Sequence, residues 1–210
     1  MPTTPGLPVR RAALRLLDAV FRRGETLEQA EGAALGDIRK APDRALAKAI
    51  AGEALRWLTD LDALIDSATN QNLPDDAKAR MVLRIMLAQA LRLDTPPHAV
   101  IATGLPLLAG GPRRLAHGVF SALVKRNSPL PLAGGAGGGP ATDAPDHAHP
   151  NPSRKREGLL PEAPTLPAAV QARWGEAKAA AIAPGLAFPP GLDLALKDAA
   201  ETETRAVAMG

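Results

Sequence analysis

Apolar residues recur at helical spacing in successive segments of this chain up to residue 127. The clearest stripe is Val82, Leu83, Met86, Leu87 and Ala90, where steps of three and four residues place the apolar side chains on one helix face. Amphipathic helices bury such faces by packing against one another. The pattern therefore predicts an all-α fold, a bundle of helices, over residues 8–127.

The composition favours helices over sheets and excludes cysteine chemistry. Apolar residues make up 46% of the chain, with only three phenylalanines, two tryptophans and no tyrosine, and much of the apolar content is Ala and Leu. The chain has no cysteine, which rules out disulfides, Cys-ligated zinc and a Cys nucleophile. With no signal peptide and no apolar run of membrane-spanning length, we expect a cytoplasmic protein with no membrane partner.

The ends of the expected helices follow from local signals. Those helices cover residues 8–23, 26–36, 43–58, 75–93, 97–108 and 113–127, with the third continuing past a bend to residue 68. Gly24 is expected to cap the first helix, and Thr26 to begin the second. Asp75 or Asp76 is the expected N-cap of the helix that follows them.

Three further expectations concern particular residues in the helical region. Leu46 belongs to the apolar stripe of the third helix and should face inward. Pro106 should kink the helix at 97–108 or end it early. The sequence Gly110-Gly111-Pro112 should stop one helix before the next begins at Arg113.

The composition changes sharply after residue 127. Residues 128–165 are rich in Gly and Pro and are predicted to form a flexible linker, with a glycine run that has no strand before it and no phosphate-loop ending. Residues 166–210 hold a helical pattern at 167–183, followed by apolar/polar alternation at 192–197 that predicts a strand. One strand is not stable alone, so it needs a partner from another copy or from sequence outside this chain.

Paired basic residues at helix ends are the candidate binding groups. Cations at a helix C-terminus are ordinary partners of its dipole, but Arg10 and Arg11 open the first helix and oppose that dipole. This misfit suggests a phosphate partner there. The net charge of +3 permits nucleic-acid binding without requiring it, so a plain solvated basic face stays an equal alternative. The candidate RNA-binding residues are Arg10, Arg11, Arg113, Arg114, Lys125 and Arg126.

Other polar groups have structural explanations. The carboxylate pairs Asp60/Asp62 and Asp75/Asp76 are expected at helix ends, where caps and dipole partners account for them. His147 and His149 lie in the expected linker, where a metal site lacks ordered support. We therefore expect no catalytic residue, no cofactor site and no metal site in this chain.

Several strings resemble the NusB/RsmB family, and the resemblance covers about residues 8–127. They are Val9-Arg10-Arg11-Ala12-Ala13, Gly52-Glu53-Ala54-Leu55-Arg56, residues 83–91, Pro97-His98-Ala99-Val100 and residues 118–126. Two groups share this helical module: the free-standing NusB antitermination factor, and the N-terminal domain of RsmB-type ribosomal RNA cytosine-C5 methyltransferases. The strings around Arg173-Trp174-Gly175 and Leu192-Asp193-Leu194 resemble the junction that precedes the catalytic domain of the second group.

The resemblance implies ribosomal RNA as a partner and S-adenosylmethionine as the cofactor of the full-length family. The family's catalysis also implies two Cys residues, and this chain has none. The favoured interpretation is an RNA-binding domain (8–127), a linker (128–165) and the truncated start of an α/β methyltransferase region (166–210). Such a chain is expected to be inactive by itself and to have the missing methyltransferase domain as a partner. The alternatives are a NusB-like antitermination or ribosome-assembly factor and a helical protein–protein adaptor.

Overall fold

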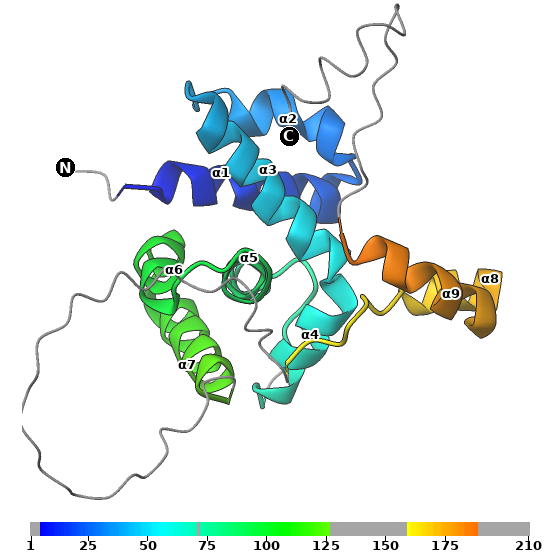
Figure 1. Cartoon of the computed structure of the whole chain (residues 1–210). Helices are drawn as coiled ribbons and strands as arrows, with labels where there is room; N and C mark the ends of the chain where they lie inside the picture. The colour runs from blue at the N-terminus through cyan, green and yellow to red at the C-terminus, as the bar shows by residue number, and fades with distance from the viewer. Residues whose placement is uncertain (1–4, 71, 127–158, 189–210) are drawn as a thin grey trace, which may run out of the picture.

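The computed structural model describes residues 5–70, 72–126 and 159–188, and within these residues every regular element is a helix. Figure 1 shows their arrangement. The α-helices are α1 (Leu7–Asp18), α2 (Leu27–Leu35), α3 (Ala41–Arg56), α4 (Leu58–Ser67), α5 (Lys78–Arg92), α6 (Pro97–Gly104), α7 (Gly110–Arg126), α8 (Ala168–Trp174) and α9 (Glu176–Leu186). A π-helical turn, η1 (Ala19–Arg23), continues α1, and a 3₁₀ turn, η2 (Leu105–Leu107), follows α6. The predicted all-α fold is confirmed for the described part of the chain.

Helix α5 is the centre of the bundle. It contacts α1, α3, α4, α6 and α7, and Figure 1 looks almost down its axis with these helices around it. The predicted stripe from Val82 to Ala90 is buried, but so is every other residue from Ala79 to Ala90. Because neighbours surround α5, its polar side chains need partners inside the protein.

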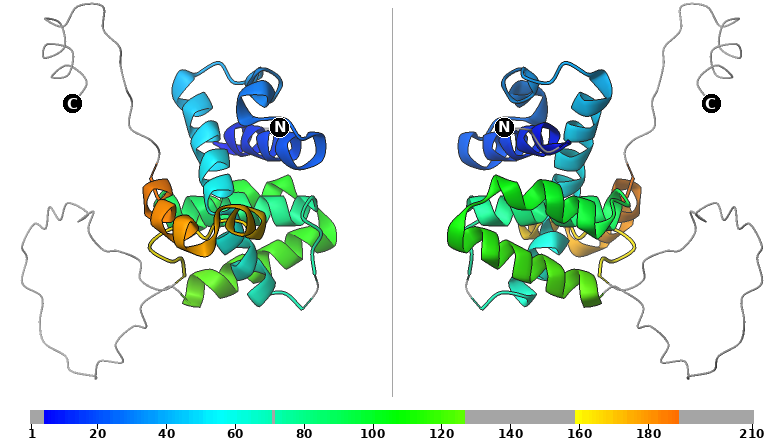
Figure 2. Two further views of the ribbon diagram at one scale, coloured as in Figure 1. Left: turned by 90° about the vertical axis from the view of Figure 1, so that its right-hand side faces the viewer. Right: turned by 90° about the vertical axis from the view of Figure 1, so that its left-hand side faces the viewer.

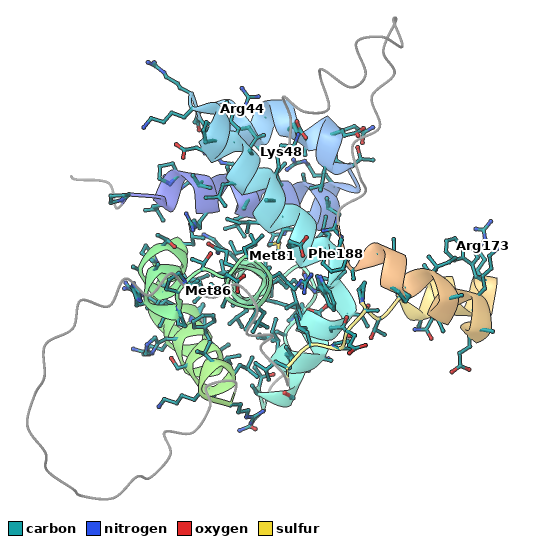
Figure 3. The ribbon with its side chains drawn as sticks, viewed as in Figure 1. Arg44, Lys48, Met81, Met86, Arg173 and Phe188 are labelled. Atoms are coloured by element: carbon teal, nitrogen blue, oxygen red, sulfur yellow. The ribbon has the colours of Figure 1, made fainter. Side chains whose placement is uncertain are left out.

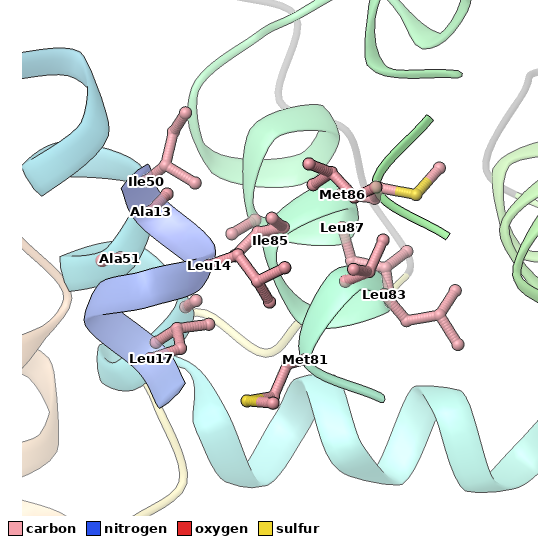
Figure 4. Packing of buried hydrophobic residues seen from close by; sticks show 14 of the residues in the cluster. Ala13, Leu14, Leu17, Ile50, Ala51, Met81, Leu83, Ile85, Met86 and Leu87 are labelled. Carbon is pink, nitrogen blue, oxygen red and sulfur yellow. The ribbon is translucent and has the colours of Figure 1, made fainter. Parts of the chain in front are cut away.

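The core joins two groups of helices, α1–α3 and α4–α7, which Figure 2 shows from two further sides. Figure 4 shows Leu14 of α1 directed toward Ile85 of α5, and Ala13 of α1 next to Ile50 of α3. These four side chains belong to one buried apolar cluster, which also contains the fully buried Trp57 and Phe120. Most of the core is aliphatic, as the Ala- and Leu-rich composition predicts.

Several predicted helix ends are confirmed. Gly24 ends η1 at a φ of 65°, and its N–H bonds back to the carbonyls of Ala19 and Val20. The Thr26 side chain accepts from the Gln29 N–H, and the Gln29 side chain accepts from the Thr26 N–H, which forms a capping box. Helix α6 ends at Gly104, and Pro106 lies in the 3₁₀ turn that follows.

Other predictions at helix ends are wrong. Helix α5 begins at Lys78 with Ala77 as its N-cap, so neither Asp75 nor Asp76 caps it. Their carbonyls instead accept from Arg84 and Arg22, because long cationic side chains from other elements reach this turn.

Two predictions about α3 and α7 also fail. Leu46 is exposed, because the buried face of α3 at these turns is formed by Ala47, Ile50 and Ala51 and Leu46 lies at its edge. Gly110, Gly111 and Pro112 form the first turn of α7 rather than a stop, because proline is tolerated where a helix begins.

The described tail folds against the bundle as a helical hairpin. The single helix predicted at 167–183 is two helices, separated by Gly175 at a φ of 81°, and α8 packs against α9 (Figures 1 and 2). Thr165 donates from its N–H and Oγ1 to the two carboxylate oxygens of Asp60, at 2.8 and 2.6 Å. Ala187 is buried in the core cluster, and its carbonyl accepts from Arg92 Nη2 at 3.0 Å.

The predicted strand at 192–197 and residues 128–158 of the predicted linker lie outside the described residues. The division into 8–127, 128–165 and 166–210 stays a prediction. No helix in the described part is long and apolar enough to span a membrane.

Candidate nucleic-acid interface

The structure separates the six predicted RNA-binding residues by environment. Arg11, Arg113, Arg114, Lys125 and Arg126 are exposed, whereas Arg10 is buried with 9% of its surface accessible. No ion pair joins any of the five exposed residues to another described residue. Five of the six are therefore accessible to a ligand.

Arg10 has a protein partner in place of the expected phosphate. Its Nε donates to Oε1 of the buried Gln89 at 2.7 Å, and its Nη1 lies 3.5 Å from the Gly6 carbonyl. Burial lowers the pKa of the Arg10 guanidinium, which stays charged at neutral pH. The misfit with the helix dipole thus has a structural cause at Arg10, and the argument for a phosphate partner remains only for Arg11.

A groove of about 510 Å³ runs along the exposed side of α1. Arg11, Arg15, Asp18 and Arg22 follow one another at steps of four, three and four residues, which keeps them on one face. Lys78, the first residue of α5, lines the groove as well. The apolar part of the lining is Leu14, Met81, Pro106 and Leu107. We call this the cationic groove, because four cations and one carboxylate line it.

The cations of the groove differ in how they are neutralised. Arg15 pairs with Asp37 at 2.8 Å, and Arg22 pairs with Asp18 at 3.3 Å. Arg11 and Lys78 form no ion pair with any residue that the structure describes. Exposed pairs contribute little and exchange readily with another anion. The groove therefore holds two free cations and two that can change partner, an arrangement suited to a chain of phosphates.

Sequence reasoning missed Arg15, Arg22 and Lys78. Arg22 stands at the C-terminal end of the first helix, where a cation is an ordinary partner of the helix dipole, although its spacing from Arg11 places both on one face. Lys78 carries no such signal, because only the packing of α5 against α1 brings it to the groove.

The two basic pairs of α7 lie at opposite ends of that helix. Arg113 and Lys125 are separated by about 18 Å along its axis at 1.5 Å per residue. Helix α7 begins soon after Leu107 of the groove lining, so Arg113 and Arg114 lie at the end nearer to the groove. Lys125 and Arg126 lie at the far end and do not form one site with Arg11.

Buried ion pairs fix the start of α5, where Lys78 stands. Arg84 donates from Nε and Nη2 to the two oxygens of Asp62, both at 2.8 Å. Arg80 Nη1 lies 3.1 Å from the same carboxylate, and Arg80 also pairs with Asp66. The Arg84 guanidinium stacks on the Phe21 ring, 4.4 Å from its centroid, which ties η1 to α5. These contacts hold the two walls of the groove together.

Comparison with known protein families identifies most of the helical bundle. The model of the NusB family matches residues 7–107. These residues form a NusB-family domain. The match contains every residue that lines the cationic groove, whereas Arg113, Arg114, Lys125 and Arg126 lie beyond it. The predicted family resemblance is confirmed for this part of the chain.

A curated relative extends beyond the NusB domain. The chain is 31% identical over 122 residues to the ribosomal RNA small subunit methyltransferase B of Xanthomonas campestris pv. campestris. The alignment covers 58% of this chain and 28% of the relative. The chain thus spans little more than a quarter of the length of that protein.

Two solved structures share the fold. One chain comes from the crystal structure of a plectonemic RNA supercoil, with a TM-score of 0.53 and 20% identity, covering 57% of this chain and 94% of that one. The other comes from the crystal structure of antitermination factors NusB and NusE in complex with dsRNA, with a TM-score of 0.51 and 20% identity, covering 57% and 96%. At this identity the likeness establishes the fold of the NusB domain.

Proposed function

We propose that this chain binds RNA, and that the phosphate backbone lies in the cationic groove. The observation that carries the proposal is the presence of Arg11 and Lys78 in one groove without an ion-pair partner among the described residues. Within the described residues, neither cation forms an ion pair that holds the fold together. Replacing either one should therefore weaken phosphate binding and leave the fold intact. The names of the two solved structures, which both include RNA, support the same ligand.

The finer proposal is that the chain corresponds to the N-terminal, RNA-binding part of a ribosomal RNA cytosine-C5 methyltransferase. The name of the Xanthomonas relative and the resemblance of the tail to a methyltransferase junction support it. S-adenosylmethionine would supply the methyl group in the complete protein. Residues 5–70, 72–126 and 159–188 contain no strand followed by a glycine-rich turn, the arrangement that would hold S-adenosylmethionine. We therefore assign these residues to RNA binding and not to methyl transfer.

A free-standing NusB-like factor is the second candidate. It is favoured by the solved chains, because 94% and 96% of their length corresponds to residues within this chain. In that case the helices α8 and α9 are an accessory to a complete RNA-binding module. A preference for small-subunit ribosomal RNA over other structured RNAs of equal length would favour the methyltransferase assignment.

Crosslinking followed by mass spectrometry tests where the RNA lies. The full chain is irradiated with a fragment of small-subunit ribosomal RNA, and crosslinked peptides are identified. We expect nucleotides on the segments that contain Arg11 to Arg22 and Lys78. Crosslinks confined to α8 and α9 would overturn the placement of the RNA in the cationic groove. No RNA binding at all would overturn the proposed function and favour the adaptor interpretation.

A further inference from the structure

A second set of cations lies outside the cationic groove. Arg39, Lys40, Arg44 and Lys48, here called the α3 stripe, are all exposed at the end of the α2–α3 loop and along the first turns of α3. Figure 3 labels Arg44 and Lys48 on this part of α3. Lys48 pairs with Glu31 at 2.7 Å, whereas the other three form no ion pair with a described residue.

The helix itself does not account for these charges. Lys40 is the N-cap of α3 and makes no side-chain capping bond, and cations at a helix N-terminus oppose its dipole. Lys40, Arg44 and Lys48 are spaced by four residues, so they lie on one face at intervals of about 6 Å. The stripe is therefore a line of cations that an extended anion can follow.

The cationic groove reaches the loop that leads to the stripe through one residue of α1. Arg15 lines the groove and pairs with Asp37, which stands just before Arg39 in the α2–α3 loop. A hollow of about 330 Å³ lies between Pro8 of α1 and the loop residues Arg39 and Lys40. The carboxylates of Asp37 and Asp43 line this hollow beside Arg39 and Lys40, so Arg15 and the stripe cations approach each other across two acidic groups.

We propose that the α3 stripe is a second contact for the phosphate backbone of the RNA that occupies the cationic groove. The proposal rests on the proposed function and adds to it a path across α1. The stripe contains no aromatic side chain on which a base can stack, so it holds the backbone and does not read the sequence. An RNA long enough to cross α1 gains these contacts, and a shorter one does not.

The test compares three double variants of the full chain with the parent. Lys40→Gln/Arg44→Gln removes two stripe cations, and Arg11→Gln/Lys78→Gln removes the two free cations of the groove. Arg173→Gln/Lys178→Gln is the matched control, because it removes one Arg and one Lys from α8 and α9, away from both sites (Figure 3). Affinity for ribosomal RNA fragments of increasing length is measured over a range of salt concentrations, and thermal unfolding confirms that each variant folds.

The expected result is that the stripe variant lowers the salt dependence of long-RNA binding. The slope of log K against log salt should fall by about 1.4 for two lost contacts with a single strand, with no change for short RNA and none for the control. A stripe variant that matches the parent, while the groove variant loses its slope, would overturn the second contact and leave the proposed function standing.

Three other results are also decisive. If neither double variant changes the slope, the proposed function and the second contact both fail. If the control lowers the slope as much as the stripe variant, the stripe is no more than part of the overall charge, and its assignment fails. Loss of binding to an acidic protein, with RNA binding unchanged, would assign the stripe to a protein partner instead.

Discussion

The Nε atom of Arg10 donates to Oε1 of Gln89 across 2.7 Å, and this hydrogen bond joins α1 to the central helix α5. Gln89 is fully buried and donates from Nε2 to the carbonyl of Ile85, so its oxygen is committed to Arg10. The pair anchors the helix that carries the groove face.

Replacing Arg10 should therefore affect stability rather than RNA contact. Arg10→Ala leaves the Gln89 oxygen buried without a partner, and we expect a loss of about 2–3 kcal/mol in the free energy of unfolding. Urea unfolding followed by circular dichroism measures it. Arg11→Ala is the matched control on the exposed side of α1 and should change stability by less than about 0.5 kcal/mol. Equal losses in the two variants would contradict the assignment of Arg10.

The Asp62 carboxylate is expected to be the most important acidic group for stability. Asp62→Ala leaves the buried guanidinium of Arg84 without its bidentate partner, at a cost of about 3–5 kcal/mol. Asp66→Ala removes a half-exposed partner of Arg80 and should cost about 1 kcal/mol or less. Denaturant unfolding compares the two, and a similar small effect in both would show that Arg84 does not depend on Asp62.

A methyl group at Gly104 should strain the contact between α6 and α5. A Cβ there would lie 2.6 Å from Cγ of the buried Met86, and such overpacking costs about 1–3 kcal/mol. Gly118→Ala is the control, because a Cβ at that helical position meets nothing within 4 Å and should stabilise by about 0.4–1 kcal/mol.

Met86→Ala provides the second arm of that experiment. If the close contact is the cause, the double variant should lose less stability than the two single losses added together. Additive losses in thermal or urea unfolding would place the cost of Gly104→Ala elsewhere.

Asp60 should hold the tail against the bundle. It accepts two hydrogen bonds from Thr165, and Asp60→Ala removes both. We expect faster amide hydrogen exchange in α8 and α9, with exchange in α5 unchanged. Asp60→Asn keeps an acceptor for one of the bonds and should give an intermediate effect. Unchanged exchange in α8 and α9 for both variants would show that Ala187 and Arg92 suffice to dock the tail.

The sequence predicted those features that depend on local chemistry. The helical period located α1 to α7, and Gly24 and Thr26 marked helix ends because their conformations and capping bonds involve near neighbours. Features that depend on packing were missed. The partner of Arg10 stands far away in the chain at Gln89, and Lys78 reaches the groove only through the placement of α5.

Leu46 shows the complementary error. Its spacing fits the apolar stripe of α3, but the buried face at these turns is formed by Ala47, Ile50 and Ala51, so the Leu46 side chain lies at the edge of that face and is exposed. Helical periodicity gives the approximate face on which a residue lies, and only the tertiary structure decides where the covered part of that face ends.

The dependence of RNA affinity on salt is the most direct test of the central claim, that the cationic groove binds the RNA backbone. Fluorescence anisotropy with a single-stranded ribosomal RNA fragment measures it for the parent, for Arg11→Gln/Lys78→Gln and for the control Arg173→Gln/Lys178→Gln. We predict that the slope of log K against log salt falls by about 1.4 in the groove variant and stays unchanged in the control. A folded groove variant with the affinity and slope of the parent would contradict the claim.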